Sequence, residues 1–394
     1  MPRSRRPSAY SLASSHGSSY SRRGSSKAHL YDSDSAPSAP PLEAMDQVSG
    51  YESISFDAVN IPPPPGSQTC KTAADKTEQP LPFDEERVTE KQARSALMAF
   101  AKKHFCYGTA VPKDMAVTLL KYSSAFHYEL ETFTEKRETS WTYAPYHGGV
   151  IDGPENGSAP LPWSIEVTPT NPFEDEIKVV QVPHTASVKT CHRCHAAGNL
   201  PCNECNSKGW VRCISCNGSS YNTDASGNKE RCFYCYTTTY GRGRQDCCKC
   251  DTTGKLNCPT CDGTGHLLCY IQLTVTWKVN SSEHLVDCDA VPEALIRGAS
   301  GKVAFDHEGE AIAPIKHFPD ETINMASAQL LQQHKRMFKD QHVLSQRHQV
   351  RIIPVTTVRY EWKYHRGFYY IYGEEHKVFC PDYPQKCCCG CTLM

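Results

Sequence analysis

Hydrophobic and polar positions follow two different periods along this chain, and the first clear pattern is helical. Thr89 and Gln92 have the spacing of a capping box, and apolar residues then recur at helical spacing until Gly108. These apolar residues are Ala93, Leu97, Phe100, Ala101 and Phe105. The pattern predicts an amphipathic helix of about five turns. It also predicts a second short helix or turn over residues 115–122.

A two-residue alternation, typical of strands, replaces the helical period from Phe126 onward. The charged residues Glu135-Lys136-Arg137 interrupt it, so this stretch predicts a hairpin with a charged turn. Two further strands are predicted over residues 163–168 and 177–182. The second of them leads directly into a segment rich in cysteine.

Alternation returns after the cysteine-rich segment. Residues 271–279 predict a strand, and Asn280-Ser281-Ser282 predict a turn before a short strand over residues 284–288. If residues 177–182 pair with residues 271–279, the cysteine-rich segment is an insertion that projects from one sheet.

The last third of the chain predicts a long helix over residues 322–349 and then an aromatic hairpin. The hairpin joins residues 352–362 to residues 368–372 around His365-Arg366-Gly367. Three histidines of the predicted helix are too far apart to form a metal pair, and we assign them to a solvated face. They are His334, His342 and His348.

Six CxxC pairs follow one another between Cys191 and Cys261. They read CHRC from Cys191, CNEC from Cys202, CISC from Cys213, CFYC from Cys232, CCKC from Cys247 and CPTC from Cys258. A redox CxxC normally occurs once, at the start of a helix, whereas these pairs lie among turn residues. The chain has 22 cysteines and no recognisable export signal, and cytosolic thiols stay reduced. Zinc thiolate sites are therefore predicted rather than disulfides.

The spacing of the pairs predicts which cysteines share a metal ion. The first three pairs begin eleven residues apart, and so do the last two. A chain that runs out along one strand and back along another brings such pairs together in nested order, and four thiolates make the closed tetrahedral site that structural zinc prefers. The predicted sites are Cys191, Cys194, Cys258 and Cys261; Cys202, Cys205, Cys247 and Cys250; and, at the tip, Cys213, Cys216, Cys232 and Cys235. The tip spacing breaks the symmetry, because the fourth and fifth pairs begin fifteen residues apart, so two or three Zn²⁺ ions are expected.

Glycines support the same arrangement, since sharp turns around a metal can require positive φ. Four of the pairs have a glycine four positions after their second cysteine: Gly198, Gly209, Gly254 and Gly265. The unit CPTCDGTG resembles the CxxCxGxG repeat of the DnaJ-type cysteine-rich domain at every position, and CHRCHAAG, CNECNSKG and CCKCDTTG resemble it without the first glycine. The resemblance covers residues 188–270. It implies zinc binding and a region that holds unfolded protein clients.

The chain departs from the DnaJ pattern in two ways. It has six candidate units where DnaJ proteins usually have four, and it lacks the His-Pro-Asp tripeptide of a J domain. A Ser/Pro-rich head, a small domain, a DnaJ-like ribbon and a β-rich tail together resemble the animal Ssu-two homologue family. The expected fold class is α+β, a β-rich body with the zinc ribbon inserted between its strands as an extended β-hairpin.

The expected domain organisation follows from these patterns. It comprises a disordered Ser/Pro-rich tail over residues 1–80, an α+β domain over 81–186, the zinc ribbon over 187–270, a second α+β part over 271–383 and a flexible tail over 384–394. The net charge of −1 gives no electrostatic case for nucleic acid. No apolar run approaches the ~20 residues needed to span a bilayer.

The last four residues, Cys391-Thr392-Leu393-Met394, match the C-a-a-X prenylation motif and predict a farnesyl group on Cys391. One lipid chain binds membranes only marginally, and palmitoyl groups on neighbouring cysteines would supply the second signal. These cysteines are Cys387, Cys388 and Cys389. The expected location is the cytoplasm, with peripheral attachment to membranes, and the nucleus stays open.

No motif of a hydrolase, nucleotide-binding or dinucleotide-binding enzyme occurs in the chain, and no small-molecule substrate is evident. The leading prediction is a non-enzymatic zinc protein, a chaperone-like or adaptor module that binds protein segments or unfolded clients. Two alternatives remain. One is a thiol-disulfide oxidoreductase with zinc-free CxxC pairs, and the other is a nucleic-acid-binding zinc protein, which the neutral charge disfavours.

Overall fold

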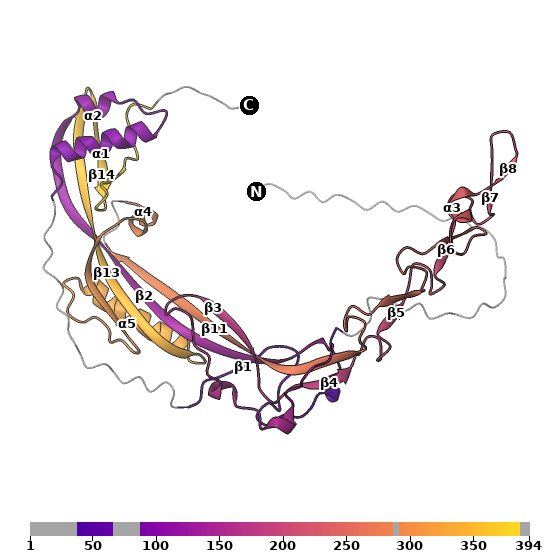
Figure 1. Ribbon diagram of the computed structural model, residues 1–394. Helices are drawn as coiled ribbons and strands as arrows, with labels where there is room; N and C mark the ends of the chain where they lie inside the picture. The colour runs from indigo at the N-terminus through magenta and orange to yellow at the C-terminus, as the bar shows by residue number, and fades with distance from the viewer. Residues whose placement is uncertain (1–37, 66–86, 287–290, 387–394) are drawn as a thin grey trace, which may run out of the picture. The chain divides into compact units, whose positions relative to one another are not determined.

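The computed structural model describes residues 38–65, 87–286 and 291–386. Its helices are η1 (Leu42–Ala44), α1 (Glu90–Lys103), α2 (Ala110–Asp114), η2 (Pro154–Asn156), η3 (Pro162–Ser164), α3 (Phe233–Tyr236), α4 (Glu293–Arg297) and α5 (Glu321–Met337). Its strands are β1 (Val59–Ile61), β2 (Ala116–Pro145), β3 (Glu176–Gln181), β4 (Ser187–Thr190), β5 (Asn199–Pro201), β6 (Trp210–Arg212), β7 (Tyr221–Thr223), β8 (Lys229–Arg231), β9 (Arg244–Asp246), β10 (Lys255–Asn257), β11 (His266–Val286), β12 (Lys302–Gly309), β13 (His342–Trp362), β14 (His365–Tyr372) and β15 (Lys377–Phe379). Figure 1 labels most of them, and the predicted α+β class is confirmed.

One antiparallel sheet carries the body of the protein. Its strands follow the order β15-β14-β13-β2-β11-β3, and β1, β12 and β4 pair with β2, β13 and β11 respectively. The central strand β2 has 30 residues and pairs with β13 on one side and β11 on the other, as Figure 1 shows. The predicted domains over 81–186 and 271–383 therefore contribute strands to the same sheet.

Helices cover both faces of this sheet. The capping box at Thr89 is confirmed at the start of α1, which packs on the end formed by β13, β14 and β15. Helix α5 packs where Val350 of β13 is buried, whereas α4 packs near Ile353 of the same strand. Side chains an odd number of residues apart in a strand point to opposite faces, so α5 and α4 lie on opposite sides of the sheet.

The predicted hairpin with a charged turn at Glu135-Lys136-Arg137 is wrong, because these residues lie in the middle of β2. Glu135 and Arg137 are two residues apart and share one face, where both are buried. Arg137 Nε donates to Glu135 Oε1 at 2.6 Å, and its Nη1 donates to the carbonyls of Pro162 and Ile165. The charges stay in the strand because they neutralise each other under a covering loop.

That covering loop replaces the strand predicted over residues 163–168. It consists of η3 and irregular backbone, and the indole of Trp163 lies against the Arg137 guanidinium, with 4.7 Å from Cζ to the ring centroid. The second predicted helix is also displaced. Helix α2 ends at Asp114, and residues 116–122 already belong to β2, while α1 ends at Lys103 rather than near Gly108.

The predicted pairing of the two strands that flank the cysteines is confirmed, because β3 and β11 are antiparallel neighbours from Gln181↔Gln272 to Glu176↔Trp277. The turn predicted at Asn280-Ser281-Ser282 is wrong, since β11 continues to Val286. These polar residues have partners in the neighbouring strand β2 and in helix α5. Asn280 Nδ2 donates to Thr134 Oγ1 at 3.0 Å, and Ser282 Oγ lies 2.8 Å from His334 Nε2.

Only the first half of the predicted long helix is helical. Helix α5 ends at Met337, and β13 begins at His342 and pairs with β2 along its length. The assignment of its histidines to a solvated face is wrong for His334 and His348, which are both buried. The aromatic hairpin is confirmed, but its turn lies at Lys363 and Tyr364, where Lys363 has φ 55°.

Part of the predicted N-terminal tail belongs to the folded body. The described segment 38–65 contains η1 and β1, and β1 pairs with β2. Three of its side chains, Met45, Val48 and Tyr51, are buried in the core that contains Trp141. The rest of the tail, like the predicted lipid-carrying cysteines, lies outside the described residues. Across the described ranges, no helix is long and apolar enough to cross a bilayer.

Candidate metal centres

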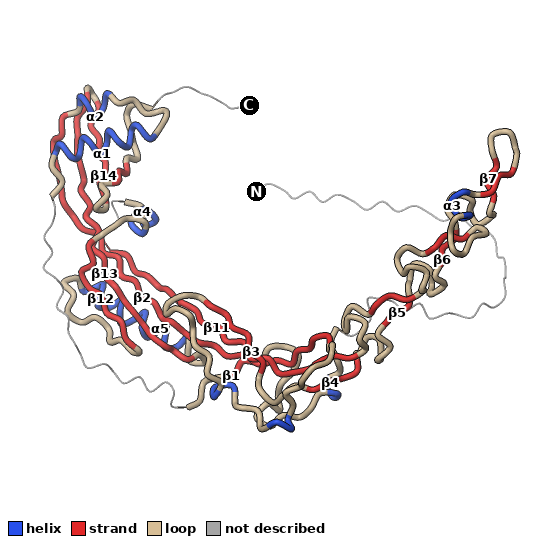
Figure 2. Tube along the Cα trace, viewed as in Figure 1, coloured by secondary structure: helices blue, strands red, loops and turns tan. Residues whose placement is uncertain are grey.

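Three short two-stranded pairings build the cysteine-rich ribbon. Strand β5 pairs with β10, β6 with β9 and β7 with β8, each over three residues and each antiparallel. Figure 2 shows these strands separated by loops. The out-and-back chain predicted from the eleven-residue spacing is therefore observed, with the hairpin of β7 and β8 at its tip.

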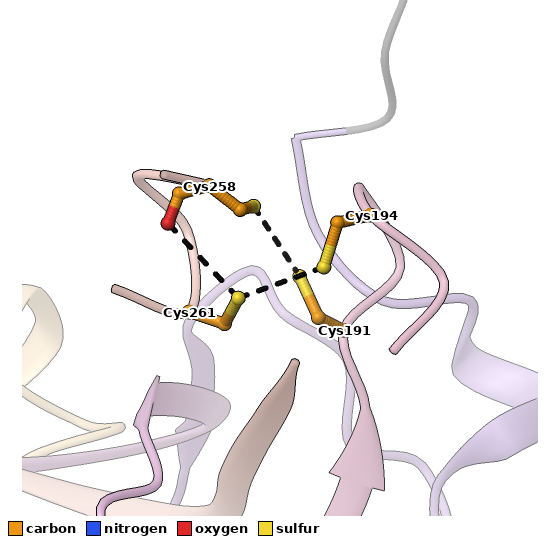
Figure 3. A group of neighbouring side chains, drawn as sticks. All are labelled: Cys191, Cys194, Cys258 and Cys261. Carbon is orange, nitrogen blue, oxygen red and sulfur yellow. Dashed lines mark hydrogen bonds between the residues drawn. The ribbon is translucent and has the colours of Figure 1, made fainter. Parts of the chain in front are cut away.

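The structure brings together the same three sets of four cysteines that the spacing predicts. They are Cys191, Cys194, Cys258 and Cys261; Cys202, Cys205, Cys247 and Cys250; and Cys213, Cys216, Cys232 and Cys235. Within each set all four sulfurs lie within 4.8 Å of one another, and all twelve residues are buried. Figure 3 shows the first set, in which the four side chains converge. We call them the root, middle and tip groups in that order.

The sulfur spacing fits a four-coordinate metal. In the root group Cys191 Sγ lies 3.8 Å from Cys258 Sγ, and Cys194 Sγ lies 3.6 Å from Cys261 Sγ. The corresponding distances are 3.8 and 3.6 Å in the middle group and 3.8 and 3.7 Å in the tip group. A tetrahedron with zinc–sulfur bonds of about 2.3 Å has edges of about 3.8 Å. The thiolate donor set and its spacing therefore suit zinc.

Backbone hydrogen bonds join the two halves of each group. In the middle group the Cys202 amide donates to the carbonyl of Gly254, and the Cys247 amide donates to the carbonyl of Gly209. The root group repeats this exchange through Gly265 and Gly198. The amides of Gly209 and Gly254 also donate to the sulfurs of Cys205 and Cys250, at 3.2 and 3.3 Å. We call each CxxC pair with the turn that follows it a knuckle. Each glycine thus links its own knuckle to the opposite one.

Gly254 shows why this position requires glycine. Its φ is +71°, and a Cβ atom there would lie 2.3 Å from the Ser207 carbonyl oxygen of the opposite knuckle. Backbone therefore contacts backbone at the point where the two knuckles meet. The glycine pattern seen in the sequence thus has a structural cause.

The irregular tip spacing has a simple explanation. The Cys213 amide donates to the carbonyl of Gly243, and the Cys232 amide donates to that of Ser220, so the same exchange occurs in the tip group. Gly243 lies eight positions after Cys235 instead of four. Four extra residues in this knuckle turn the eleven-residue spacing into fifteen. The sequence has no glycine four positions after Cys235, which hides this equivalence.

Hydroxyl side chains add support that our sequence interpretation missed. In four of the six units a serine or threonine three positions after the second cysteine donates to the carbonyl of that cysteine: Ser219, Thr238, Thr253 and Thr264. The recurrence of Ser or Thr at this position was a readable signal. Each of these bonds satisfies a carbonyl at the turn after the metal knuckle.

The electrostatics of each group favour partial ionisation. In the middle group burial raises the pKa of Cys205, but the Gly209 amide and the neighbouring cysteines outweigh burial and lower that pKa to about 7. In the tip group burial likewise opposes ionisation of Cys232, yet the Cys235 amide and the Ser215 hydroxyl lower its pKa to about 6. In the root group the pKa of Cys258 is lowered in the same way, against burial, by the Cys261 and Thr260 amides. Each group thus contains at least one thiol with a lowered pKa, whereas burial and the neighbouring cysteines raise the pKa of Cys194, Cys235 and Cys250 to about 12. A bound metal ion would supply the positive charge that deprotonates these remaining thiols.

The root group is continuous with the core of the sheet. Its four cysteines pack in the same cluster as Trp141, Leu267 and Ile271. The middle and tip groups have small clusters of their own. The root group thus joins the ribbon to the folded body.

Comparisons with known proteins give the family. The chain is 36% identical over 376 residues to the human protein named Protein SSUH2 homolog, covering 91% of this chain and 95% of that protein. The zebrafish (Danio rerio) protein of the same name is 34% identical over 356 residues, covering 90% and 96%. The mouse protein is 34% identical over 255 residues, covering 64% and 72%.

No protein-family model matches the chain, and no solved structure matches it. The human and zebrafish relatives nevertheless match about nine tenths of the chain, so the identity is not limited to the cysteine repeats. The resemblance to the Ssu-two homologue family noted from the sequence is confirmed. The chain belongs to the SSUH2 homologue family.

Proposed function

We propose that this protein is a non-enzymatic zinc protein whose ribbon acts as a chaperone-like or adaptor module that binds protein segments. The observation that carries the proposal is the set of three buried four-cysteine groups with tetrahedral sulfur spacing. Zinc is the metal of choice because closed sites of four thiolates in reduced compartments are typical of it. The proposed stoichiometry is three zinc ions per chain.

A structural rather than catalytic role follows from the ligand count. Four cysteines complete a tetrahedral site and leave no position for a water or substrate. The ribbon strands have only three residues each, so metal would supply most of their stability. The ribbon is then a scaffold for surface side chains.

The burial of the cysteines counts against a thiol-disulfide oxidoreductase. Such an enzyme needs an accessible nucleophilic sulfur, whereas all twelve paired cysteines are buried and gathered in fours. The DnaJ-like repeat, which in DnaJ proteins serves to hold clients, supports protein segments as partners.

We further propose that lipid groups attach the protein to the cytoplasmic face of membranes. The support is the sequence motif at Cys391, with Cys387, Cys388 and Cys389 beside it, outside the described residues. Cys391→Ser should shift the protein from the membrane fraction of animal cells to the soluble fraction. An unchanged membrane fraction would rule the anchor out.

The metal and the binding activity can be tested on the full-length protein purified from animal cells. Native mass spectrometry should show three zinc ions per chain, and none would overturn the proposal. The zinc-loaded protein should also bind a reduced, unfolded model protein in fluorescence anisotropy more tightly than it binds the folded form of the same protein. Equal or absent binding would contradict the client-binding role.

A further inference from the structure

The tip group differs from the root and middle groups in the residues between its paired cysteines. Three of these four residues are large and apolar, Ile214, Phe233 and Tyr234, with exposed fractions of 88, 74 and 62%, and the fourth is Ser215. The same positions of the middle group hold Asn203, Glu204, Cys248 and Lys249. The positions between paired ligands thus carry polar or small side chains in the middle group and mostly large apolar side chains in the tip group.

The geometry of the knuckles keeps these apolar side chains at the surface. The four sulfurs of the tip group occupy its interior, and Ile214, Phe233 and Tyr234 are exposed on its outside. Tyr236 follows the last ligand directly and is also exposed. Because the knuckle backbone is held by its cysteines, these side chains lose little additional backbone entropy on binding, which favours recognition.

The extra residues of the tip knuckle are ordered rather than loose. Thr238 Oγ1 donates to the carbonyls of Cys235 and Arg244, at 3.0 and 2.9 Å. The Asp246 carboxylate accepts the amides of Thr239 and Tyr240. The insertion therefore enlarges the tip with a fixed loop that adds a further exposed tyrosine, Tyr240.

Positive charges outnumber negative ones in the same stretch of chain, and Arg231 Cζ lies 5.4 Å from the ring centroid of Tyr236. Five exposed cations lie between residues 212 and 244: Arg212, Lys229, Arg231, Arg242 and Arg244. The same stretch holds two carboxylates, and one of them, Asp224, is engaged by the amides of Ser226 and Asn228 in the hairpin turn. A zinc ion with four thiolates would offset two of these positive charges, which leaves a net charge of +1 over residues 212–244. The Asp246 carboxylate just beyond this stretch is engaged by the amides of Thr239 and Tyr240.

We propose that this tip surface, formed by Ile214, Phe233, Tyr234 and Tyr236 with the neighbouring cations, binds a protein segment that carries both apolar side chains and carboxylates. The inference rests on the proposed function and specifies its site and partner. Apolar side chains of the segment bury the exposed rings and Ile214, and carboxylates pair with the arginines.

A protein segment fits the tip surface better than single-stranded nucleic acid does. The most exposed of its large apolar side chains is Ile214, which is aliphatic and offers no ring on which a base can stack.

The test uses zinc-loaded full-length protein and three fluorescein-labelled probes. One is a peptide composed of leucine, phenylalanine and glutamate, one is the same peptide with lysine in place of glutamate, and one is oligothymidine. The variant Phe233→Ser/Tyr234→Ser alters the tip surface. Asn203→Ser/Glu204→Ser is the control, because it changes the two residues between one pair of ligands in the middle group. Zinc content must stay equal in all proteins.

We expect the wild type to bind the glutamate peptide at least about tenfold more tightly than the lysine peptide. The tip variant should lose at least about tenfold in affinity for the glutamate peptide, because it lacks the two aromatic side chains that the bound peptide would cover. The affinity of the control should not change. An unchanged affinity in the tip variant would overturn the inference, as would oligothymidine binding that exceeds peptide binding and depends on Phe233 and Tyr234.

The unfolded model protein separates the two proposals. If wild type and tip variant bind it equally, and the peptide equally, the ribbon binds clients elsewhere and only the tip surface is disproved. If the wild type binds neither probe, the proposed function itself fails.

Discussion

At the scale of single residues, the contact between opposite knuckles determines whether a metal group tolerates a side chain in place of a glycine. The Cβ position of Gly254 meets a carbonyl of the other knuckle, whereas that of Gly227, in the hairpin turn between β7 and β8, has nothing within 4 Å. Both have positive φ, +71° and +83°. A comparison of Gly254 with Gly227 therefore separates the free-energy cost of positive φ from the cost of a steric clash with the opposite knuckle.

Gly254→Ala should weaken zinc binding, and Gly227→Ala should not. Alanine at positive φ costs about 1–2 kcal/mol at either site, but only at Gly254 must the Ser207 carbonyl also move. Competition with a chromogenic chelator should show one zinc ion released more easily from Gly254→Ala. Equal release from both variants would mean that the knuckle contact is unimportant.

The buried pair of Glu135 and Arg137 makes a second residue-scale prediction. Glu135→Gln should lower the free energy of unfolding by about 3 kcal/mol, because it leaves the Arg137 charge buried without its carboxylate. Glu361→Gln removes the partner of Arg366 in an exposed pair and should cost less than about 1 kcal/mol. Urea denaturation of both variants measures the difference, and equal losses would refute the argument.

At the scale of elements, the interface beneath α5 is polar as well as apolar. His334 lies with its ring nitrogens 2.8 Å from Thr132 Oγ1 and 2.8 Å from Ser282 Oγ. His348 Nδ1 lies 3.3 Å from the Tyr128 hydroxyl. Burial lowers the pKa of His334, and burial together with the nearby His307 lowers the pKa of His348 to about 3.

These histidines should make the sheet acid-sensitive. Above pH 6.5 they are neutral in both states, and below it the unfolded chain binds protons that the folded chain cannot bind. For His348, stability should therefore fall by up to about 1.4 kcal/mol per pH unit as the pH drops from 6.5 towards 3. His334 should contribute in the same direction.

The variant His348→Gln should reduce this dependence when urea midpoints at pH 7.5 and pH 5 are compared with those of the wild type. The metal groups also respond to acid, so the difference between the two proteins is the informative quantity. If both lose the same stability, His348 does not contribute.

The elements that the sequence predicted correctly are those with local signals. The capping box at Thr89 and the repeated cysteine spacing are such signals, and α1 and the three four-cysteine groups follow from them. The errors occur where polar residues lie inside long strands. Glu135, Arg137 and Asn280 indicate turns locally, and only partners distant in sequence keep them in β2 and β11. Such partners cannot be read from periodicity.

At the scale of the whole molecule, the ribbon and the sheet depend on different forces. The sheet buries several large apolar clusters between its strands and helices. The middle and tip groups bury little besides cysteine. Their stability should therefore depend on metal rather than on apolar burial.

Removal of zinc should unfold the ribbon and spare the sheet. Hydrogen exchange of the chelator-treated protein should show lost protection over residues 202–250 and retained protection in the centres of β2 and β13. Restored protection after zinc is added back is the control for damage. Uniform loss over both regions would mean that the sheet also needs the metal.

The nesting of the three groups also sets an order of events during folding. The sulfurs that meet are 19 residues apart in the tip group, 45 in the middle group and 67 in the root group. Closing the largest loop of an unfolded chain costs about 1 kcal/mol more entropy than closing the smallest. Once the tip has closed, each later closure spans only the few residues between neighbouring groups. The ribbon should therefore assemble from its tip, with the tip group binding metal first, then the middle group and then the root group. The pairing of β3 with β11 would follow last.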